Sequence, residues 1–289
     1  MQSRRRKSRL SYARRISAEI RILGTSDILE RDENESAQGG TKGRKPLSRI
    51  YESPTATLEN EDCLEFMKGI ASGTVDLILT DPPYEVSRET NFRNGERKGT
   101  DTDRFRVSMD FGEWDAGFSK LGETIGEAYR VLRKGGTLIC FYDVWKLTTL
   151  RKYAEDAGFR QIRLVEWIKT NPVPLNSKTN YLTNAREVAV LGVKGGKPTF
   201  NSEYDDGIYR FPICRDAGRF HPTQKPLALF EALIRKHSNE GALVLDCFAG
   251  SGTTAVAAGN LDRRFVGCEL SEEYWEKAVE RLKETKRKK

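Results

Sequence analysis

The sequence predicts an α/β fold built on a doubly wound, mostly parallel sheet. From about Ala56 onward, short β-rich runs alternate with helical segments, and this alternation favours parallel strands joined by crossover helices. Two of the apolar runs, at 75–80 and 242–250, have an acid at or near their end, Asp81 and Asp246, with prolines or glycines a few positions later. Open α/β sheets bind ligands at the carboxyl ends of their strands, so both runs also indicate a site.

The first half of the predicted domain contains four strands and two helices. The run VDLILT at 75–80 is short and rich in β-favouring residues. The segment LGETIGEAYRVLRK has helical spacing of its apolar residues, and LRKYAEDAGF is a helix that ends at Gly158. These two helices occupy 121–134 and 150–159, and the remaining strands are expected at 135–143, 161–169 and 186–193.

The second half continues the alternation. The segment PLALFEALIRKHS (226–238) predicts a helix with Pro226 in its first turn. The run ALVLDCFAG (242–250) predicts a buried strand that enters a glycine-containing turn, and SGTTAVAAGNL (251–261) a helix of small residues. A strand at 263–270 follows, and an amphipathic helix at 271–284 takes Ser271 as its N-cap.

Composition narrows the class of protein. The 289 residues suffice for one large domain, or for a domain with an appendage. No apolar run approaches 18 residues, and no apolar stretch follows the basic N-terminus, so we expect no membrane partner and a cytoplasmic location. The five cysteines form no CxxC and only two histidines exist, which argues against a zinc site and for reduced thiols.

The formal charge of +7 is concentrated at the N-terminus. Residues 1–50 contain 13 Lys or Arg and 6 Asp or Glu, whereas the other 239 residues contain 36 of each. A basic arm suits a polyanion, and a solvated tail is an equally good interpretation. The stretch RDENESAQGGTKGRKP has no periodicity. We therefore expect a flexible arm over 1–50 and a folded domain over 56–289.

The run LDCFAGSGTT indicates a nucleoside ligand. Asp246 lies near the end of a buried strand, and Gly250 and Gly252 permit a tight turn and a close approach of a ligand to the backbone. Glu269 lies at the end of the next strand, where an acid can bind the two hydroxyls of a ribose. The sequence matches neither the dinucleotide nor the P-loop pattern, so the glycine turn alone could also be structural.

The segment Asp81-Pro82-Pro83-Tyr84 also follows a strand. Two prolines fix the backbone and remove two N–H donors, so the loop is rigid and displays carbonyl acceptors beside a carboxylate and an aromatic ring. Such a loop can hold a flat molecule that carries an NH2 group. A plain turn is the alternative, because Pro and Asp favour turns.

Taken together, VDLILTDPPY, HPTQKP (221–226), DCFAGSGTT (246–254) and Glu269 resemble the β group of DNA amino-methyltransferases, in which the catalytic DPPY segment precedes the cofactor-binding FxGxG segment. The resemblance spans roughly 56–285. It implies a seven-stranded sheet of the class I S-adenosylmethionine-dependent methyltransferase type with a circularly permuted motif order. It also implies methyl transfer from S-adenosylmethionine to an exocyclic amine of double-stranded DNA, without a metal.

The resemblance assigns roles to individual residues. Asp81 and Pro82 would accept the two N–H groups of the amine, Pro83 would keep the loop rigid, and Tyr84 would stack on a flipped-out base. Glu269 would bind the ribose, Asp62 and Cys63 the adenine, and Asp246 the methionyl end. The remaining cofactor contacts are expected from Thr223, Gln224, Lys225, Phe248, Ala249, Gly250 and Gly252. Cys63 could equally be a small core residue.

The target base and the DNA contacts are less determined. An aspartate at the first motif position resembles the N6-adenine enzymes, whereas N4-cytosine enzymes of this type more often carry serine. The polar segments 85–106 and 194–220 are candidates for DNA contacts, although loops of this composition are commonly just solvated. An N4-cytosine enzyme, a catalytically silent DNA- or RNA-binding relative, and a homodimer all stay open.

Overall fold

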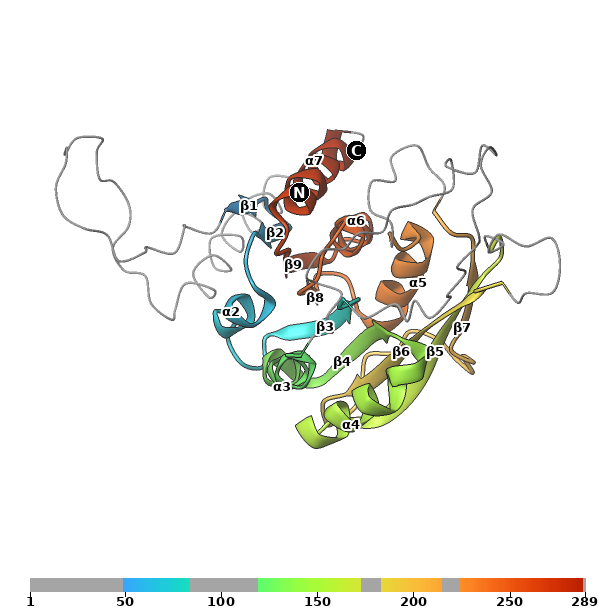
Figure 1. Cartoon of the computed structure of the whole chain (residues 1–289). Coiled ribbons are helices and arrows are strands. Elements are labelled where there is room, and N and C mark those ends of the chain that lie inside the picture. Colours follow the sequence, from blue (N-terminus) through green and yellow to red (C-terminus); the bar gives the residue numbers. More distant parts are fainter. Residues whose placement is uncertain (1–48, 84–118, 173–182, 215–223, 288–289) are drawn as a thin grey trace, which may run out of the picture.

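The computed structural model describes residues 49–83, 119–172, 183–214 and 224–287, which form one sheet with helices on both faces (Figure 1). In these ranges the sheet has nine strands in the order β1-β2-β9-β8-β3-β4-β6-β5-β7. The strands are β1 (Ile50–Glu52), β2 (Ala56–Glu59), β3 (Val75–Thr80), β4 (Leu132–Tyr142), β5 (Arg160–Lys169), β6 (Arg186–Val193), β7 (Ile208–Phe211), β8 (Leu243–Asp246) and β9 (Arg264–Cys268). The helices are α2 (Cys63–Lys68), α3 (Leu121–Val131), α4 (Leu147–Ala157), α5 (Leu227–His237), α6 (Thr253–Asn260) and α7 (Glu272–Arg287), with a 3-10 turn η3 (Val144–Lys146).

The sheet is mostly parallel, as the sequence predicts. Strands β2, β9, β8, β3 and β4 run parallel to one another. Strand β6 is antiparallel to both of its neighbours, β4 and β5, and β1 is antiparallel to β2. Because the central strands are parallel, the carboxyl ends of β2, β9, β8, β3 and β4 meet at one edge of the sheet.

The expected strand number was wrong. The resemblance implies seven strands, and the sheet has nine because β1 and β7 extend its two edges. Both are short, at 3 and 4 residues, and β7 lies within the segment 194–220 that we expected to be a loop. A run of this length carries no recognisable alternation, so only pairing with a neighbouring strand reveals it.

Several element boundaries also differ from the prediction. The helix expected over 121–134 ends at Val131, and its last residues already pair with β3 as the start of β4. The strand expected over 242–250 ends at Asp246. The folded domain begins before 56, because β1 starts at Ile50 and Arg49 binds Glu272 at 2.5 Å and Glu276 at 2.7 Å on α7.

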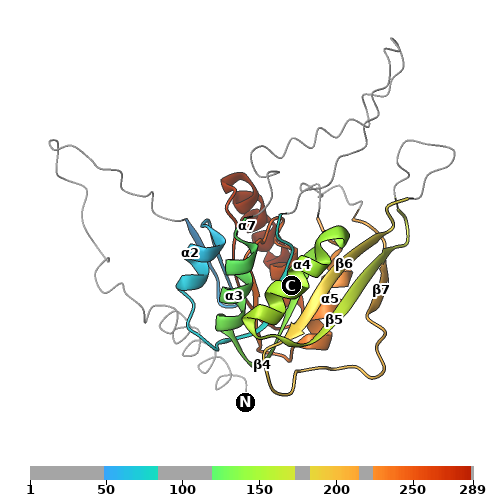
Figure 2. The ribbon, with the colours of Figure 1, turned by 60° about the horizontal axis from the view of Figure 1, so that its bottom comes forward.

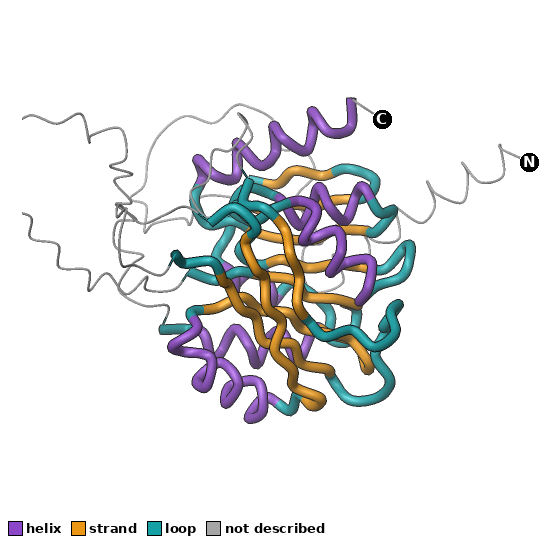
Figure 3. The backbone as a smooth tube through the Cα atoms, turned by 90° about the vertical axis from the view of Figure 1, so that its right-hand side faces the viewer, coloured by secondary structure: helices purple, strands orange, loops and turns teal. Residues whose placement is uncertain are grey.

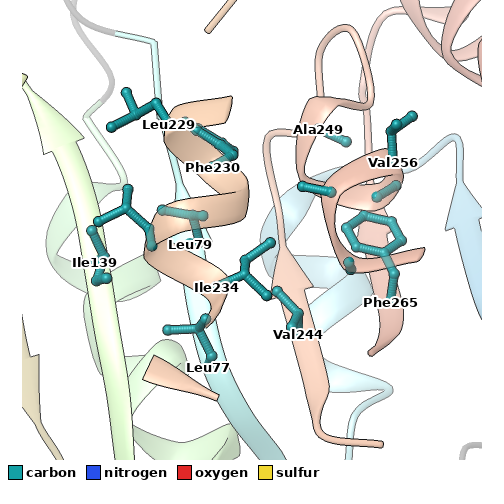
Figure 4. Close-up of a cluster of buried hydrophobic side chains, with 14 of the residues drawn as sticks. Leu77, Leu79, Ile139, Leu229, Phe230, Ile234, Val244, Ala249, Val256 and Phe265 are labelled. Carbon is teal, nitrogen blue, oxygen red and sulfur yellow. The ribbon is translucent and has the colours of Figure 1, made fainter. Parts of the chain in front are cut away.

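Helices cover both faces of the sheet, which makes the fold doubly wound (Figure 2, Figure 3). An apolar layer fills the space between helices and sheet on each face. On one face α5, α6 and α7 pack against the sheet. Figure 4 shows part of this layer, in which Phe230 and Ile234 of α5 face Leu79 of β3 and Val244 of β8. On the other face, α2, α3 and α4 cover the same strands with a second buried cluster. A fully buried Leu, Ile or Phe contributes about 1.5–3 kcal/mol, so these layers fix the positions of the strand ends.

The helix caps follow the sequence signals. Gly158 ends α4 in the left-handed conformation, with φ of 109°. The N–H of Tyr274 donates to the Ser271 hydroxyl at 3.4 Å, as expected of an N-cap, and Pro226 precedes the first residue of α5. Trp167 is buried and its indole N–H donates to the carbonyl of Phe211, so it is a core residue. None of the helices in the described ranges is long and apolar enough to cross a membrane.

Candidate active site

Asp81 stands at the carboxyl edge of the sheet, directly after the last residue of β3. Its oxygen Oδ2 accepts a hydrogen bond from the ammonium of Lys225, which lies just before α5. Its other oxygen, Oδ1, is buried and has no hydrogen-bond partner among the described residues. Pro82 is buried behind it and Pro83 is partly exposed. Asp81 therefore presents one carboxylate oxygen with an unused acceptor position.

The charges around Asp81 form a chain of alternating sign. The Lys225 side chain is only 5% exposed, and its ammonium also lies 3.1 Å from Oε2 of Glu187 on β6. The other oxygen of Glu187 pairs with Lys169 at 2.8 Å. Burial raises the pKa of Asp81, Lys225 opposes the rise, and Glu187 adds to it. Burial would also raise the pKa of Glu187, but Lys225 and Lys169 hold it below its usual range.

The turn after β8 depends on two glycines in the left-handed region. Gly250 has φ of 49° and Gly252 has φ of 71°. The N–H of Gly252 donates to the carbonyl of Ala249 at 2.7 Å, and a Cβ at Gly252 would lie 3.2 Å from the Cβ of Ala278 on α7. Positive φ and this tight packing both favour glycine. The turn thus brings backbone N–H groups close to the carboxyl edge at the start of α6.

Asp246, the last residue of β8, ties this turn to the strand that carries Asp81. Its carboxylate accepts hydrogen bonds from the hydroxyl of Thr80 at 2.7 Å, the hydroxyl of Thr254 at 2.5 Å and the N–H of Phe248 at 3.1 Å. Burial raises the pKa of Asp246 to about 6, although these hydrogen bonds favour the ionised form. The carboxylate therefore joins β3, β8 and α6 at their ends.

Glu269 follows β9 and lies against the same turn. Its Oε2 accepts from the N–H of Gly250 at 2.7 Å and its Oε1 from the N–H of Ser271 at 2.9 Å. Each carboxylate oxygen has a second lone pair, so the side chain can accept further hydrogen bonds from a ligand. Burial raises the pKa of Glu269, and the backbone N–H groups oppose the rise.

The start of α2 is held beside Glu269. The side-chain amide of Asn60 donates to the carbonyls of Glu269 at 2.8 Å and Leu270 at 3.0 Å. Asp62 is the N-cap of α2, accepting from the N–H of Leu64 at 2.9 Å, and also pairs with Lys120 at 3.4 Å. Cys63 is buried, and burial raises its pKa to about 11, so it is a neutral thiol.

The structure brings most of the predicted site residues to one edge. Lys225 binds Asp81, and Thr80, the residue before Asp81, donates to Asp246. The glycine turn lies against Glu269. Gln224 donates to the sulfur of Cys214 at 3.5 Å, and its buried carbonyl oxygen has no hydrogen-bond partner among the residues that the structure describes. Ala249 is buried and Phe248 is partly exposed. Tyr84, Thr223 and segment 85–106 lie outside the described residues, as do 1–48 and 215–220.

Sequence reasoning missed three residues of this edge: Thr80, Asn60 and Glu187. Thr80 lies within the segment VDLILTDPPY and Asn60 two residues before Asp62, but nothing local marks their partners, which are 166 and 209 residues away. Glu187 lies in a strand that was predicted only as a strand. The available signal was an acid at the start of an otherwise apolar run, because Val188, Ala189 and Val190 follow it and are all buried.

Comparison with known proteins identifies the family. A family model described as DNA methylase, N6_N4_Mtase, matches residues 75–280, from the first residue of β3 into α7. The chain belongs to the N6/N4 DNA methylase family. This DNA methyltransferase is 30% identical over 270 residues to the type II methyltransferase M2.DpnII of Streptococcus pneumoniae, across 86% of the chain and 96% of that relative.

Solved structures agree with this assignment. The crystal structure of the M1.HpyAVI–SAM complex is 28% identical to the methylase, with a TM-score of 0.60 over 78% of this chain and 98% of that one. The PvuII DNA methyltransferase, described as cytosine-N4-specific, shares the fold with a TM-score of 0.59 at 16% identity, over 81% of this chain and 92% of that one. The family comprises both N6 and N4 enzymes, and these matches do not separate the two.

Proposed function

We propose that this methylase transfers a methyl group from S-adenosylmethionine to N6 of an adenine that is flipped out of duplex DNA. The observation that carries the proposal is the carboxylate of Asp81, whose buried Oδ1 has no partner in the described structure. Such an oxygen can accept an N–H from an amine. The aspartate at the first motif position favours adenine over cytosine.

The residues at the carboxyl edge fit S-adenosylmethionine. The turn with left-handed Gly250 and Gly252 carries no side chains at these two positions, so a ligand can approach its backbone after β8. Glu269, after β9, keeps lone pairs that can accept from ribose hydroxyls. Asp62 and Cys63 at the start of α2 would approach the adenine, since Asn60 holds this segment beside Glu269. The buried carbonyl oxygen of Gln224, which has no partner in the described part of the chain, fits the methionine portion. When bound, the cofactor supplies an electrophilic methyl group on a sulfonium.

Asp81 and its loop would activate the amine by position and charge. The lone pair of an exocyclic amine is delocalised into the ring, so the nitrogen is a weak nucleophile. A carboxylate that accepts one N–H, with the Pro82 carbonyl accepting the other, orients the nitrogen and favours the positive charge that develops during attack. Asp246 is satisfied by three donors and acts as a structural link between the two halves of the site.

Chain order supports a permuted arrangement. The segment with Asp81 precedes the glycine turn in the chain, yet β3 and β8 are neighbours in the sheet. We interpret this as the circularly permuted form of the methyltransferase fold. Because the relative M2.DpnII is a type II methyltransferase, our proposal includes a role in restriction-modification.

DNA contacts would come from outside the sheet. The proposal assigns them to the basic arm before Arg49, which carries the excess positive charge of the chain, and to the polar segments 85–106 and 194–220. It includes action in the cytoplasm and leaves a homodimer to be measured.

The test is methyl transfer from radiolabelled S-adenosylmethionine to unmethylated duplex DNA, followed by nucleoside analysis. The expected product is N6-methyladenine. N4-methylcytosine would overturn the base assignment, and an unlabelled DNA with bound cofactor would overturn the function. Asp81→Ala is expected to abolish transfer while the cofactor Kd stays within about twofold, because Asp81 serves the amine. Asp156→Ala, on the exposed side of α4, is the matched control and should keep full activity.

A further inference from the structure

Lys225 stands between two carboxylates in the methylase, and this arrangement is the basis of a further inference. Its ammonium contacts Oδ2 of Asp81 and lies 3.1 Å from Oε2 of Glu187. From the sequence we expected Lys225 to be one of the cofactor contacts. In the structure its two acidic partners come instead from the end of β3 and from the antiparallel strand β6.

Burial makes this pairing obligatory. A buried ammonium costs several kcal/mol unless charged partners compensate it, and the Lys225 side chain is 5% exposed. It also packs 5.4 Å from the centre of the Phe141 ring, which limits its positions. Lys225 must therefore stay paired with carboxylates. The division of its N–H donors between Asp81 and Glu187 determines which oxygens of Asp81 remain open to a substrate.

We propose that Glu187 is a positioning residue, which holds the Lys225 ammonium on one oxygen of Asp81 so that the other oxygen remains available to the substrate amine. Glu187 is itself fixed from the far side by Lys169 at 2.8 Å. Without Glu187, the donor that now faces Glu187 could turn to Asp81, and the ammonium could then cover both oxygens of Asp81. The unpartnered Oδ1 is the state that Glu187 maintains. The inference rests on the proposed function, because it assigns that oxygen to the amine.

The same chain of charges sets the basicity of Asp81. Glu187 is one cause that raises the pKa of Asp81, and Lys225 is the cause that lowers it. Removing the Glu187 charge should therefore lower the pKa of Asp81, and removing the Lys225 charge should raise it. Neutral Asp81 cannot accept with both oxygens as a carboxylate does. When the methylation rate is plotted against pH, the fall in rate on the low-pH side, the acid limb, should therefore follow the pKa of Asp81.

Two other titratable groups face Asp81. Asp246 on β8 has a pKa raised to about 6, and its shift comes from burial, from Thr254, Thr80 and Phe248, and from Asp81. Cys140 on β4 has a raised pKa through burial and stays a neutral thiol. Lys225 and Glu187 act on the pKa of Asp81 with opposite signs, so opposite movements of the acid limb in the two variants would report Asp81.

The kinetic test uses Glu187→Gln and Lys225→Met with radiolabelled S-adenosylmethionine and unmethylated duplex DNA. For Glu187→Gln we expect kcat to fall by about 10-fold to 100-fold with the cofactor Kd within about twofold, and the acid limb to move to lower pH. For Lys225→Met we expect the acid limb to move to higher pH. Asp76→Asn breaks an ion pair with Arg133 at the opposite end of β3 and controls for simple loss of stability.

A second readout does not require turnover. The pKa of Asp81 is followed by carboxyl 13C NMR in selectively labelled protein, with the signal assigned by its loss in Asp81→Ala. The expected order of pKa values is Lys225→Met highest, wild type next and Glu187→Gln lowest. If wild type methylates no DNA but the NMR order holds, the proposed function fails and the positioning network stands.

Three results would overturn the inference. The first is a Glu187→Gln enzyme with wild-type kcat. The second is an acid limb, or an NMR pKa, that moves in the same direction in both variants. The third is a large rise in cofactor Kd with Lys225→Met at unchanged kcat, which would return Lys225 to the cofactor, as the sequence suggested.

Discussion

Replacing Thr80 by valine removes one hydroxyl, and with it the hydrogen bond that connects β3, which leads to Asp81, to Asp246 at the end of β8. The Thr80 hydroxyl donates to Oδ1 of Asp246 at 2.7 Å, and both residues are buried. Valine has nearly the same shape, so the change removes the hydrogen bond and leaves no cavity. Thr137 on the neighbouring strand β4 is the matched control, because its hydroxyl is buried and has no partner in the described structure.

The expected effects of the two substitutions have opposite signs. A hydrogen bond to a charged group contributes about 1.5–3 kcal/mol, so Thr80→Val should lower the free energy of unfolding by about this amount. A buried hydroxyl without a partner costs about 1–3 kcal/mol, so Thr137→Val should be neutral or stabilising by up to this amount. The two valine variants should therefore differ by roughly 2–5 kcal/mol although each loses one hydroxyl.

The effect of Thr80→Val should also depend on pH. Burial raises the pKa of Asp246 to about 6, so its carboxylate is ionised at pH 8 and mostly protonated at pH 5 in the folded protein. The lost hydrogen bond favours the ionised form. The loss of stability should therefore be full at pH 8 and smaller at pH 5.

Urea unfolding followed by circular dichroism measures both effects, with unchanged m values as the sign that only stability has moved. Methyl transfer is expected to fall in Thr80→Val as well, because Thr80 directly precedes Asp81. Equal losses of stability for Thr80→Val and Thr137→Val would refute the assignment of the Thr80 hydroxyl to Asp246. A larger loss at pH 5 than at pH 8 would refute the ionised state of that carboxylate.

Three further predictions concern other parts of the chain. Burial lowers the pKa of His237 to about 4 from its usual 6.5. Folded His237 thus stays neutral while the unfolded form gains a proton, so stability should fall by about 2 kcal/mol between pH 7.5 and pH 5, and His237→Gln should remove this slope in urea titrations. Gly252→Ala should lower the free energy of unfolding by about 1–2 kcal/mol and weaken cofactor binding, since φ is 71° and Ala278 is close. The control Gly73→Ala, with φ of 74° and open space around it, should lose only the stability that backbone strain costs and keep its cofactor affinity in calorimetry. Deletion of 1–48 should reduce the slope of log K against log salt for DNA binding, and an unchanged slope would contradict a role for the arm.

Local signals in the sequence predicted the elements that end abruptly. Strand β3 was predicted with its observed bounds because an apolar run meets Asp81 and Pro82, where the backbone must leave the sheet. Gly158 and Ser271 marked helix ends for similar reasons, through a left-handed cap and a side-chain cap. These features depend on a few neighbouring residues, so they can be read from the chain alone.

Features that depend on distant partners could not be predicted. Lys225 and Asp81 are 144 residues apart, and Thr80 and Asp246 are 166 residues apart. The motifs placed Asp81 and Lys225 in a site, but only the folded sheet brings them into contact. Strands β1 and β7 were missed for the same reason, since neither has enough residues to show alternation and each is defined by pairing with a strand elsewhere in the chain.

The acids at the carboxyl edge differ in how many donors already occupy them, and this difference assigns their roles. Asp246 accepts three hydrogen bonds from the protein, so it has little capacity left for a ligand and serves to join strands. Glu269 accepts one backbone N–H on each oxygen and keeps a lone pair on each. Within the described ranges of the chain, Asp81 accepts only on Oδ2, from Lys225. The acid that the fold leaves least satisfied is the one best able to accept from a substrate, because a buried acceptor without a partner gains most when one arrives.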